Sequence, residues 1–547
     1  MRWPLYKTML TTLSAAVVEN RATKMKEAGD KSSTPPTPKP LSVTPTISAP
    51  PSQYHSPSFS RSPLLTGGDF IGPASANKTP QVSTPRFRTP RFITPIGSPL
   101  RRALHLTKLD PHDAWLPITE SRNGNAYYAA FHCLCSGIGI QALVLPVAFT
   151  VLGWSWAIIC FTIAFIWQLY TLYILVHLHE SYESGIRYSR YMQLAGATFG
   201  EKQAKWLALF PIMYLAAGTC ATLVIIGGSS LKTLFQVACG DHCTAHQLTT
   251  TEWYLVFTSA AVILSQLPNL NSIAGVSLIG ATTAISYCTI IWVVSVDKGK
   301  MPGVSYNPVH ASNDFKRTFD VLNALGILAF AFRGHNLILE IQATMPSSEK
   351  RPSRIPMWRG VKVAYTLIAA CLYPLAIAGY WAYGQMIPEN GGMLAALYAF
   401  HSRDTSHFVL GMTSLFVVIN CLSSFQIYGM PIFDDMESVY TRWKKAACPW
   451  WIRASTRVLF GYFTFFTAVA LPFVSSLAGL IGGISLPVTL AYPCFMWLKM
   501  MKPKEKSPMW FLNWGLGLFG MVLSVALIVS SIYKLVDTGI KLNFFKP

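Results

Sequence analysis

The sequence predicts an all-α, polytopic membrane protein, and three observations support this fold class. Hydrophobic residues fill 51% of the 547 positions and charged residues only 12%, whereas about a quarter of the residues in soluble domains are charged. After residue 120 the apolar residues gather in runs close to the roughly 20 residues that a helix needs to cross a bilayer. The runs lack strand-like alternation, and backbone polar groups in lipid must be satisfied within the segment, so we expect helices.

The first 120 residues are expected to form a disordered cytosolic tail. From Lys31 to Pro99 the chain is rich in Ser, Thr and Pro, and it has too few aliphatic side chains to offset the entropy of ordering. Ten Ser-Pro or Thr-Pro dipeptides lie here, and a repeated Thr-Pro-Arg-Phe begins at Thr84 and Thr89. Proline-directed kinases are therefore candidate partners, since each phosphate would cancel positive charge near anionic lipid. The alternative is a solvated linker.

Eleven apolar runs follow, and we expect them to form a membrane domain over 121–535, with a short segment 536–547 after it. Most have the length of one bilayer crossing, which makes the lipid bilayer a predicted partner. The runs are 126–149, 154–177, 207–231, 253–268, 272–295, 320–344, 361–383, 406–430, 455–474, 477–498 and 509–533.

The loop charges predict the orientation of these helices. If the N-terminus is cytosolic, the inside loops hold 18 Lys and Arg, while the outside loops and the C-terminus hold 8. This bias follows the positive-inside rule and places the C-terminus outside. It also accounts for much of the net charge of +20, so nucleic acid is not an expected partner.

The cysteines predict neither a metal site nor a cofactor site. Most of the eleven lie singly inside apolar runs, where a thiol acts as a small apolar filler. No spacing matches a zinc site. Cys239 and Cys243 fall in a loop on the outer side, where a disulfide is a candidate in an oxidising compartment.

Eleven spans divide into two units of five and one further span, as expected for an inverted repeat. A unit of five spans has odd length, so the second unit must enter the membrane from the opposite side. Such repeats place the substrate site where the first helix of each half is broken. Spans one and six should therefore contain helix breakers, and they contain Gly137, Gly139 and Gly334.

The two broken segments form the predicted substrate site. Free N–H groups at the start of a half-helix suit a carboxylate, and unpaired carbonyls suit an ammonium group, so together they fit a zwitterionic amino acid. The alternative is that the glycines only allow close helix packing. The candidate binding residues are Ser136, Gly137, Ile138, Gly139, Ile140, Gln141, Phe330, Ala331, Phe332, Arg333, Gly334 and Asn420.

Five polar residues inside the runs are further candidates. Arg333 costs about 2.5–3.5 kcal/mol near a helix centre, so it should contact a substrate carboxylate or a carboxylate partner, or be held by exposed carbonyls. His335 is the candidate for proton coupling. Asn420 should contact the ligand or bond to a neighbouring helix. His132 is expected to be a satisfied packing histidine, and Glu340 should form a salt bridge with a base in a loop.

Several stretches of the sequence resemble plant lysine/histidine transporter-like proteins of the amino acid/auxin permease family, within the amino acid–polyamine–organocation superfamily. The resemblance covers about 115–545. The stretches that carry it are Phe131-His132, Leu145-Pro146, Leu178-His-Glu180, Arg190-Tyr191, Phe199-Gly200, Leu264-Ser-Gln-Leu-Pro-Asn269, Gly334-His-Asn336, Leu339-Glu-Ile-Gln-Ala343, Pro356-Met-Trp-Arg-Gly360 and Met430-Pro-Ile-Phe-Asp434. It implies a LeuT-type fold of eleven helices, a 5+5 inverted repeat plus one, that imports amino acids with protons across the plasma membrane.

Three departures from the family pattern affect the expected substrate. Gly139-Ile140-Gln141 stands where the family commonly has Gly-Ala-Gly, Arg333 replaces a small residue, and Asn420 replaces a frequent histidine. A lysine or histidine substrate is therefore not implied, because Arg333 would disfavour cationic side chains. We expect a proton-coupled amino-acid symporter and not an enzyme. The alternative is a non-transporting amino-acid sensor of the same fold that signals through its tail.

Overall fold

The computed structural model describes residues 122–180, 186–240, 248–267, 274–308, 313–348, 350–471 and 474–538, which belong to one unit. The predicted tail and the segment 539–547 lie outside these ranges. The helices and helical turns, in chain order, are α4 (Ala126–Gly137), α5 (Ile140–Leu178), α6 (Tyr191–Phe199), α7 (Glu201–Ala204), η3 (Lys205–Leu209), α8 (Phe210–Cys239), α9 (Thr250–Leu264), α10 (Ala274–Lys298), α11 (Asp314–Ala331), α12 (His335–Ala343), α13 (Arg354–Tyr383), η4 (Gly384–Met386), α14 (Gly392–His401), α15 (His407–Lys444), α16 (Trp450–Ala470), α17 (Val474–Leu486), η5 (Pro487–Ala491), α18 (Tyr492–Met501) and α19 (Pro508–Thr538).

The predicted all-helical class is confirmed, since the regular elements of the described ranges are helices. Seven stretches there are long and apolar enough to cross a membrane: Ile140–Leu178, Glu201–Cys239, Ala274–Lys298, Arg354–Met386, His407–Lys444, Val474–Met501 and Pro508–Asp537. The predicted gap between the runs 126–149 and 154–177 coincides with a break inside α5. Gly153, at φ 71° and ψ 178°, interrupts the helical path there, so α5 consists of two helices joined at a kink.

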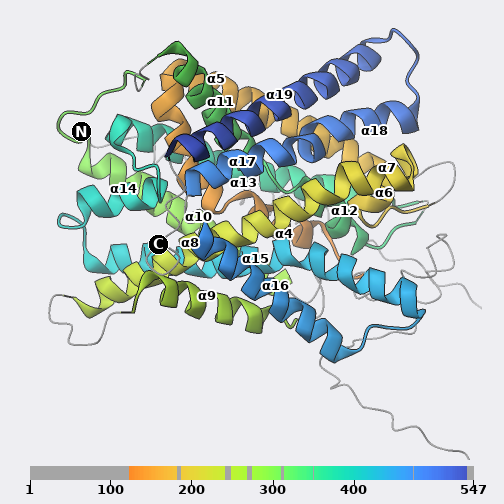
Figure 1. Ribbon diagram of the computed structural model, residues 1–547, viewed down its shortest axis with the longest axis horizontal. Helices are drawn as coiled ribbons and strands as arrows, with labels where there is room; N and C mark the ends of the chain where they lie inside the picture. Colours follow the sequence, from red (N-terminus) through yellow and green to blue (C-terminus); the bar gives the residue numbers. More distant parts are fainter. Residues whose placement is uncertain are drawn as a thin grey trace, which may run out of the picture. The chain divides into compact units, whose positions relative to one another are not determined.

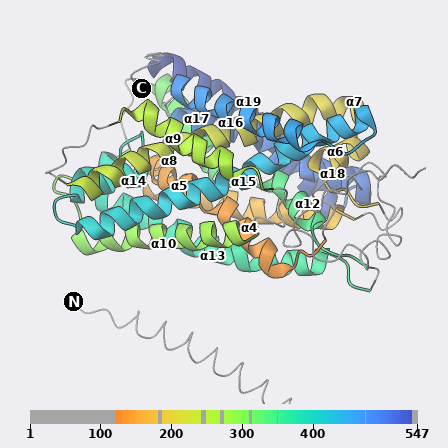
Figure 2. The same ribbon diagram turned by 90° about the horizontal axis from the view of Figure 1, so that it is seen from below.

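The long helices run between two ends of the bundle (Figures 1 and 2). One end carries α6 and α7, and we call it the α6 end; the other carries α14, and we call it the α14 end. The helix α8 packs against α15, and α15 also packs against α10. The short helix α4 is surrounded by α10, α13 and α15, while α11 packs against α5, α17 and α19. The helices α4 and α11 are therefore inner elements of the bundle.

Glycines allow α11 and α17 to approach with their backbones in contact. A Cβ added at Gly482 would lie 2.1 Å from the carbonyl oxygen of Gly326 and 2.9 Å from the nitrogen of Phe330. One added at Gly326 would lie 2.9 Å from the carbonyl oxygen of Gly479. This is the small-residue packing expected between helices in lipid. Gly326, Gly479 and Gly482 therefore serve the close packing of α11 and α17.

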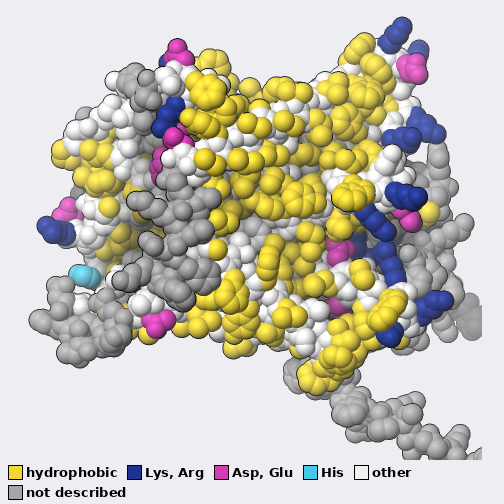
Figure 3. All heavy atoms as spheres, viewed as in Figure 1, with side chains coloured by type: hydrophobic (Ala, Val, Ile, Leu, Met, Phe, Trp, Pro, Cys, Tyr) yellow, Lys and Arg dark blue, Asp and Glu magenta, His cyan; other side chains and the backbone are white. Residues whose placement is uncertain are grey.

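The surface has the pattern of a protein surrounded by lipid. Hydrophobic side chains cover the middle of the face in Figure 3, and Lys and Arg gather near its right-hand end, the α6 end. Large apolar side chains are widely exposed, among them Trp206 at 85%, Val522 at 71% and Phe463 at 61%. A soluble monomer rarely exposes so extended an apolar surface. The middle of the bundle therefore requires a bilayer.

Candidate functional site

Both expected interruptions are present. The helix α4 ends at Gly137, Ile138 and Gly139 are extended, and α5 begins at Ile140. The helix α11 ends at Ala331, and Gly334, at φ 118°, precedes the first residue of α12. Of these glycines, Gly334 is the one whose backbone requires glycine, because side chains rarely adopt so positive a φ. Sequence reasoning located both interruptions to within a few residues.

The packing brings the two interruptions together in the interior. All twelve candidate binding residues are buried. A Cβ added at Gly334 would lie 3.7 Å from the Ser136 hydroxyl oxygen. The predicted juxtaposition of the first and second broken segments is therefore present. Their role in binding a substrate stays a prediction.

Arg333 connects the two interruptions through side chains. Its Nη2 donates to Gln141 Oε1 at 2.8 Å, and its Nε donates to the Tyr428 hydroxyl at 3.0 Å. Gln141 Nε2 and the Tyr428 hydroxyl in turn both donate to the Ser136 carbonyl oxygen, at 3.0 and 2.9 Å. Ser136 lies in the last turn of α4, where carbonyls have no helical partner. The end of α4 is thus capped by side chains that also hold Arg333.

Neutral groups surround the positive charge of the Arg333 guanidinium. Its Cζ lies 4.2 Å from the ring centroid of Phe330 and 5.0 Å from that of Tyr428, within the range of cation–π attraction. Its Nη1 is buried and has no hydrogen-bond partner among the described residues. No ion pair of Arg333 with a described carboxylate is found. The alternative that exposed carbonyls of the interruption hold Arg333 is therefore wrong for the described residues, because the side chains of Gln141 and Tyr428 hold it.

The second interruption is supported by α5. Gln168 Nε2 donates to the Phe332 carbonyl oxygen at 3.5 Å and to the Tyr365 hydroxyl at 2.9 Å. Thr171 Oγ1 lies 2.8 Å from His335 Nε2, which holds the first residue of α12 against α5. The part of His335 in proton coupling stays a prediction.

Asn420 connects two helices to the first interruption. Its Nδ2 donates to the Ile138 carbonyl oxygen at 3.4 Å and to the Gly280 carbonyl oxygen at 3.0 Å. Asn420 therefore bonds α15 to α10 and to the extended residues after α4. His132 is buried with its Nδ1 2.7 Å from the Ser277 hydroxyl, in agreement with a satisfied packing histidine.

Sequence reasoning missed three side chains of this site: Tyr428, Gln168 and Thr171. Each lies inside a predicted apolar run, where a polar side chain needs a partner. Asn420 was singled out because it is a polar side chain inside an apolar run, and the same criterion would have found these three residues. Elsewhere, Cys239 is disulfide-bonded, whereas Cys243 lies outside the described residues, so their pairing stays a prediction.

Hydrogen bonds and ion pairs close the α6 end of the bundle, where α4 begins and α12 ends. The backbone N–H of Gly124 donates to the Thr344 carbonyl oxygen at 2.9 Å, which joins the start of α4 to the end of α12. Arg187 donates to the Met345 carbonyl oxygen at 3.1 Å and pairs with Glu180 at 3.3 Å. Burial lowers the pKa of Arg187 to about 10, so it remains charged at neutral pH. Opening this end requires these contacts to break.

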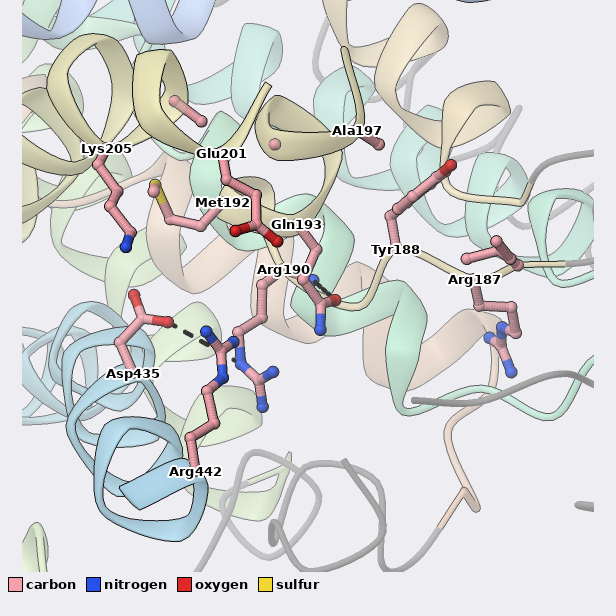
Figure 4. A pocket seen from close by; sticks show the side chains of 13 residues that line it. Arg187, Tyr188, Arg190, Met192, Gln193, Ala197, Glu201, Lys205, Asp435 and Arg442 are labelled. Carbon is pink, nitrogen blue, oxygen red and sulfur yellow. Dashed lines mark hydrogen bonds and ion pairs between the residues drawn. The ribbon is translucent and has the colours of Figure 1, made fainter. Parts of the chain in front are cut away.

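A pocket of about 660 Å³ lies at the α6 end, between α15 and the segment that begins before α6 (Figure 4). Asp435 and Arg442 reach it from α15, and Glu201 and Lys205 reach it from α7 and η3. Arg190 lies between them. Its Nε is 2.5 Å from Asp434 Oδ2 and 3.9 Å from Asp435 Oδ1, so this arginine ties the start of α6 to α15.

Breaking the ion pair between Arg190 and Asp434 is expected to destabilise the protein. Removing one partner of a buried pair costs about 3–5 kcal/mol, because the remaining charge is uncompensated. Arg190→Ala and Asp434→Ala should each lower the melting temperature of the purified protein in detergent. The double variant should lose clearly less stability than the sum of the singles. Strictly additive losses would show that the two side chains do not interact.

The described helices and their interior define a multi-pass helical membrane protein with a polar site between two interrupted helices. The family model described as transmembrane amino acid transporter protein matches residues 122–536. The chain belongs to this family, and within it to the plant lysine histidine transporter-like permeases. The resemblance drawn from the sequence is confirmed. The protein is an amino-acid transporter and not an enzyme.

Individual relatives match over most of their length. Lysine histidine transporter-like 8 of Arabidopsis thaliana is 55% identical over 518 residues, covering 93% of this chain and 98% of the relative. Lysine histidine transporter-like 7 of the same plant is 46% identical over 440 residues, covering 80% and 90%. Among solved structures, a nucleobase-cation-symport-1 family transporter in a closed conformation is similar with a TM-score of 0.49 and 12% identity, covering 80% of this chain and 97% of that one.

Proposed function

We propose that this protein is a proton-coupled symporter that moves neutral amino acids across the plasma membrane into the cytosol. The observation that carries the proposal is Arg333, a buried cation at the meeting point of two interrupted helices. Gln141 and Tyr428 hold it from two sides and leave Nη1 without a hydrogen-bond partner among the described residues. A substrate carboxylate supplies the missing acceptor and the missing negative charge.

The substrate's ammonium group binds backbone carbonyls at the end of α11, around Ala331–Arg333, while the backbone around Ser136–Gln141 completes the carboxylate site. Arg333 repels an additional positive charge on the substrate, so lysine and arginine are poor substrates. Gln141 occupies space beside Gly139, which favours small or medium side chains. Asn420, hydrogen-bonded to Ile138, positions the extended residues of the site.

The proposed topology has eleven membrane helices in a 5+5 inverted repeat with one further helix. In this arrangement α4 with the first part of α5 is span one, and α11 with α12 is span six. The gathering of Lys and Arg at the α6 end supports a cytosolic position for that end. Transport then proceeds by rocking of the two interrupted helices against the other helices, with Gly137, Gly139 and Gly334 as hinges.

Uptake of labelled amino acids into transport-deficient cells tests this function. Neutral amino acids should accumulate, more strongly at acidic than at neutral external pH, and a protonophore should abolish the difference. Accumulation that does not depend on pH would remove the proton from the proposal. Binding without accumulation would favour the sensor alternative, which the names of the relatives do not support.

A further inference from the structure

Glu340 is a buried carboxyl group that lacks the partner expected for it. It lies on α12, its exposed fraction is 4%, and its Oε2 has no hydrogen-bond partner among the described residues. The predicted salt bridge to a loop base is wrong, since no ion pair of Glu340 is found in the described part of the chain. A buried carboxylate without a partner is strongly disfavoured, and such a group binds a proton instead.

Two aspartates and one arginine lie on the elements packed against α12. The helix α12 packs against α15, which carries Asp434 and Asp435, and against α6, which Arg190 precedes. Arg190 is already engaged with both aspartates, at 2.5 and 3.9 Å. A third negative charge would therefore add repulsion from two carboxylates, with one shared arginine to offset it. While the α6 end is closed, Glu340 keeps its proton.

The position of Glu340 links this proton to the substrate site. The helix α12 has nine residues, beginning at His335 directly after the interruption, and Glu340 lies on it. So short a helix moves as one piece. Movement of α12 that opens the substrate site toward the α6 end therefore also moves Glu340 away from its present surroundings.

Water can reach the neighbours of Glu340 from the α6 end. Arg190 and Asp435 both line the pocket of about 660 Å³ shown in Figure 4. In the proposed cycle, opening of the α6 end lets water from this pocket reach α12. Hydration of Glu340 then favours the carboxylate form.

We propose that Glu340 is the proton-carrying group of the transport cycle, an inference that rests on the proton-coupled function proposed above. Its carboxyl O–H bond holds the proton during substrate entry and closure. When the α6 end opens, the proton passes to water in the pocket beside Arg190 and Asp435, and a carboxylate remains. When the empty carrier again faces the outside, a proton from the external solution binds the Glu340 carboxylate before the next substrate enters. His335, hydrogen-bonded to Thr171, positions α12 instead of carrying the proton.

Purified full-length protein in liposomes, with an imposed pH gradient and the best neutral substrate of the uptake screen, tests the proposal. One pH unit can drive about tenfold accumulation with one coupled proton. Glu340→Gln keeps the neutral form permanently, so it should lose this accumulation while exchanging labelled for unlabelled substrate at a rate independent of pH. Glu201→Gln is the control at the same end of the bundle, because Glu201 lines the pocket of Figure 4 but is exposed to solvent. It should retain the gradient-driven accumulation.

The outcomes separate this inference from the proposed function. A wild type that exchanges substrate but ignores the pH gradient would overturn proton symport itself. A coupled wild type with an equally coupled Glu340→Gln would overturn only the role of Glu340. If Glu340→Gln loses exchange as well, Glu340→Asp decides: recovered coupling with a shifted pH profile supports the proposal, and no recovery overturns it.

Discussion

Replacing Arg333 by leucine is expected to abolish amino-acid uptake at low substrate concentration. The guanidinium is the one cation that reaches from the second interruption to Gln141 and Tyr428, at 2.8 and 3.0 Å, among the described residues. Hydrogen bonds to a charged group contribute about 1.5–3 kcal/mol, so loss of the substrate carboxylate contact should raise the half-saturation concentration about tenfold or more. Uptake kinetics over a wide concentration range measure this change.

Two further variants make the test of Arg333 specific. Arg333→Lys keeps the charge but cannot form both side-chain bonds at once, so its uptake should be intermediate. Arg403→Leu removes an exposed arginine between α14 and α15 and should leave uptake unchanged. Because Arg333→Leu also leaves Gln141 Oε1 without its donor, thermal stability in detergent should be measured beside uptake. A stable Arg333→Leu protein with wild-type kinetics would exclude a role in substrate binding.

Replacing Gly482 by leucine is expected to prevent assembly of the membrane domain. A Cβ at this position would lie 2.1 Å from the Gly326 carbonyl oxygen, and a backbone group cannot rotate away as a side chain can. Inserting atoms into a packed interior costs about 1–3 kcal/mol, and more where the obstacle is backbone. Since α11 leads into the second interruption, separation of α17 from α11 should also displace Arg333. Size-exclusion elution and melting temperature in detergent report the loss.

A glycine on the outer face supplies the control for Gly482. A Cβ added at Gly515, in α19, would meet no atom within 4 Å. Alanine also favours a helix over glycine by about 1 kcal/mol. Gly515→Ala should therefore elute and melt like the wild type or slightly better. If Gly482→Leu behaved in the same way, the close approach of α11 and α17 would have to be wrong.

The all-helical class and the positions of the two helix interruptions could be predicted from the sequence. Helices follow from apolar runs of bilayer length, because lipid offers the backbone no other hydrogen-bond partners. The interruption before α12 follows from Gly334, whose positive φ is a local property of glycine. Arg333 could also be singled out from the sequence, because a charged side chain inside an apolar run is costly in lipid unless it has a partner or a function.

The partners of these residues could not be predicted from the sequence. Gln141 and Arg333 are 192 positions apart, and the hydroxyl that binds both Arg333 and Ser136 comes from Tyr428 on a third helix. Glu340 was expected to pair with a loop base, but Arg190 is held by Asp434 instead. Hydropathy and glycine positions determined which segments are helical and where two of them break, because those properties belong to each segment alone. Only the packing of distant helices decided which polar groups meet, because many pairings satisfy the same composition and one arrangement of the helices selects among them.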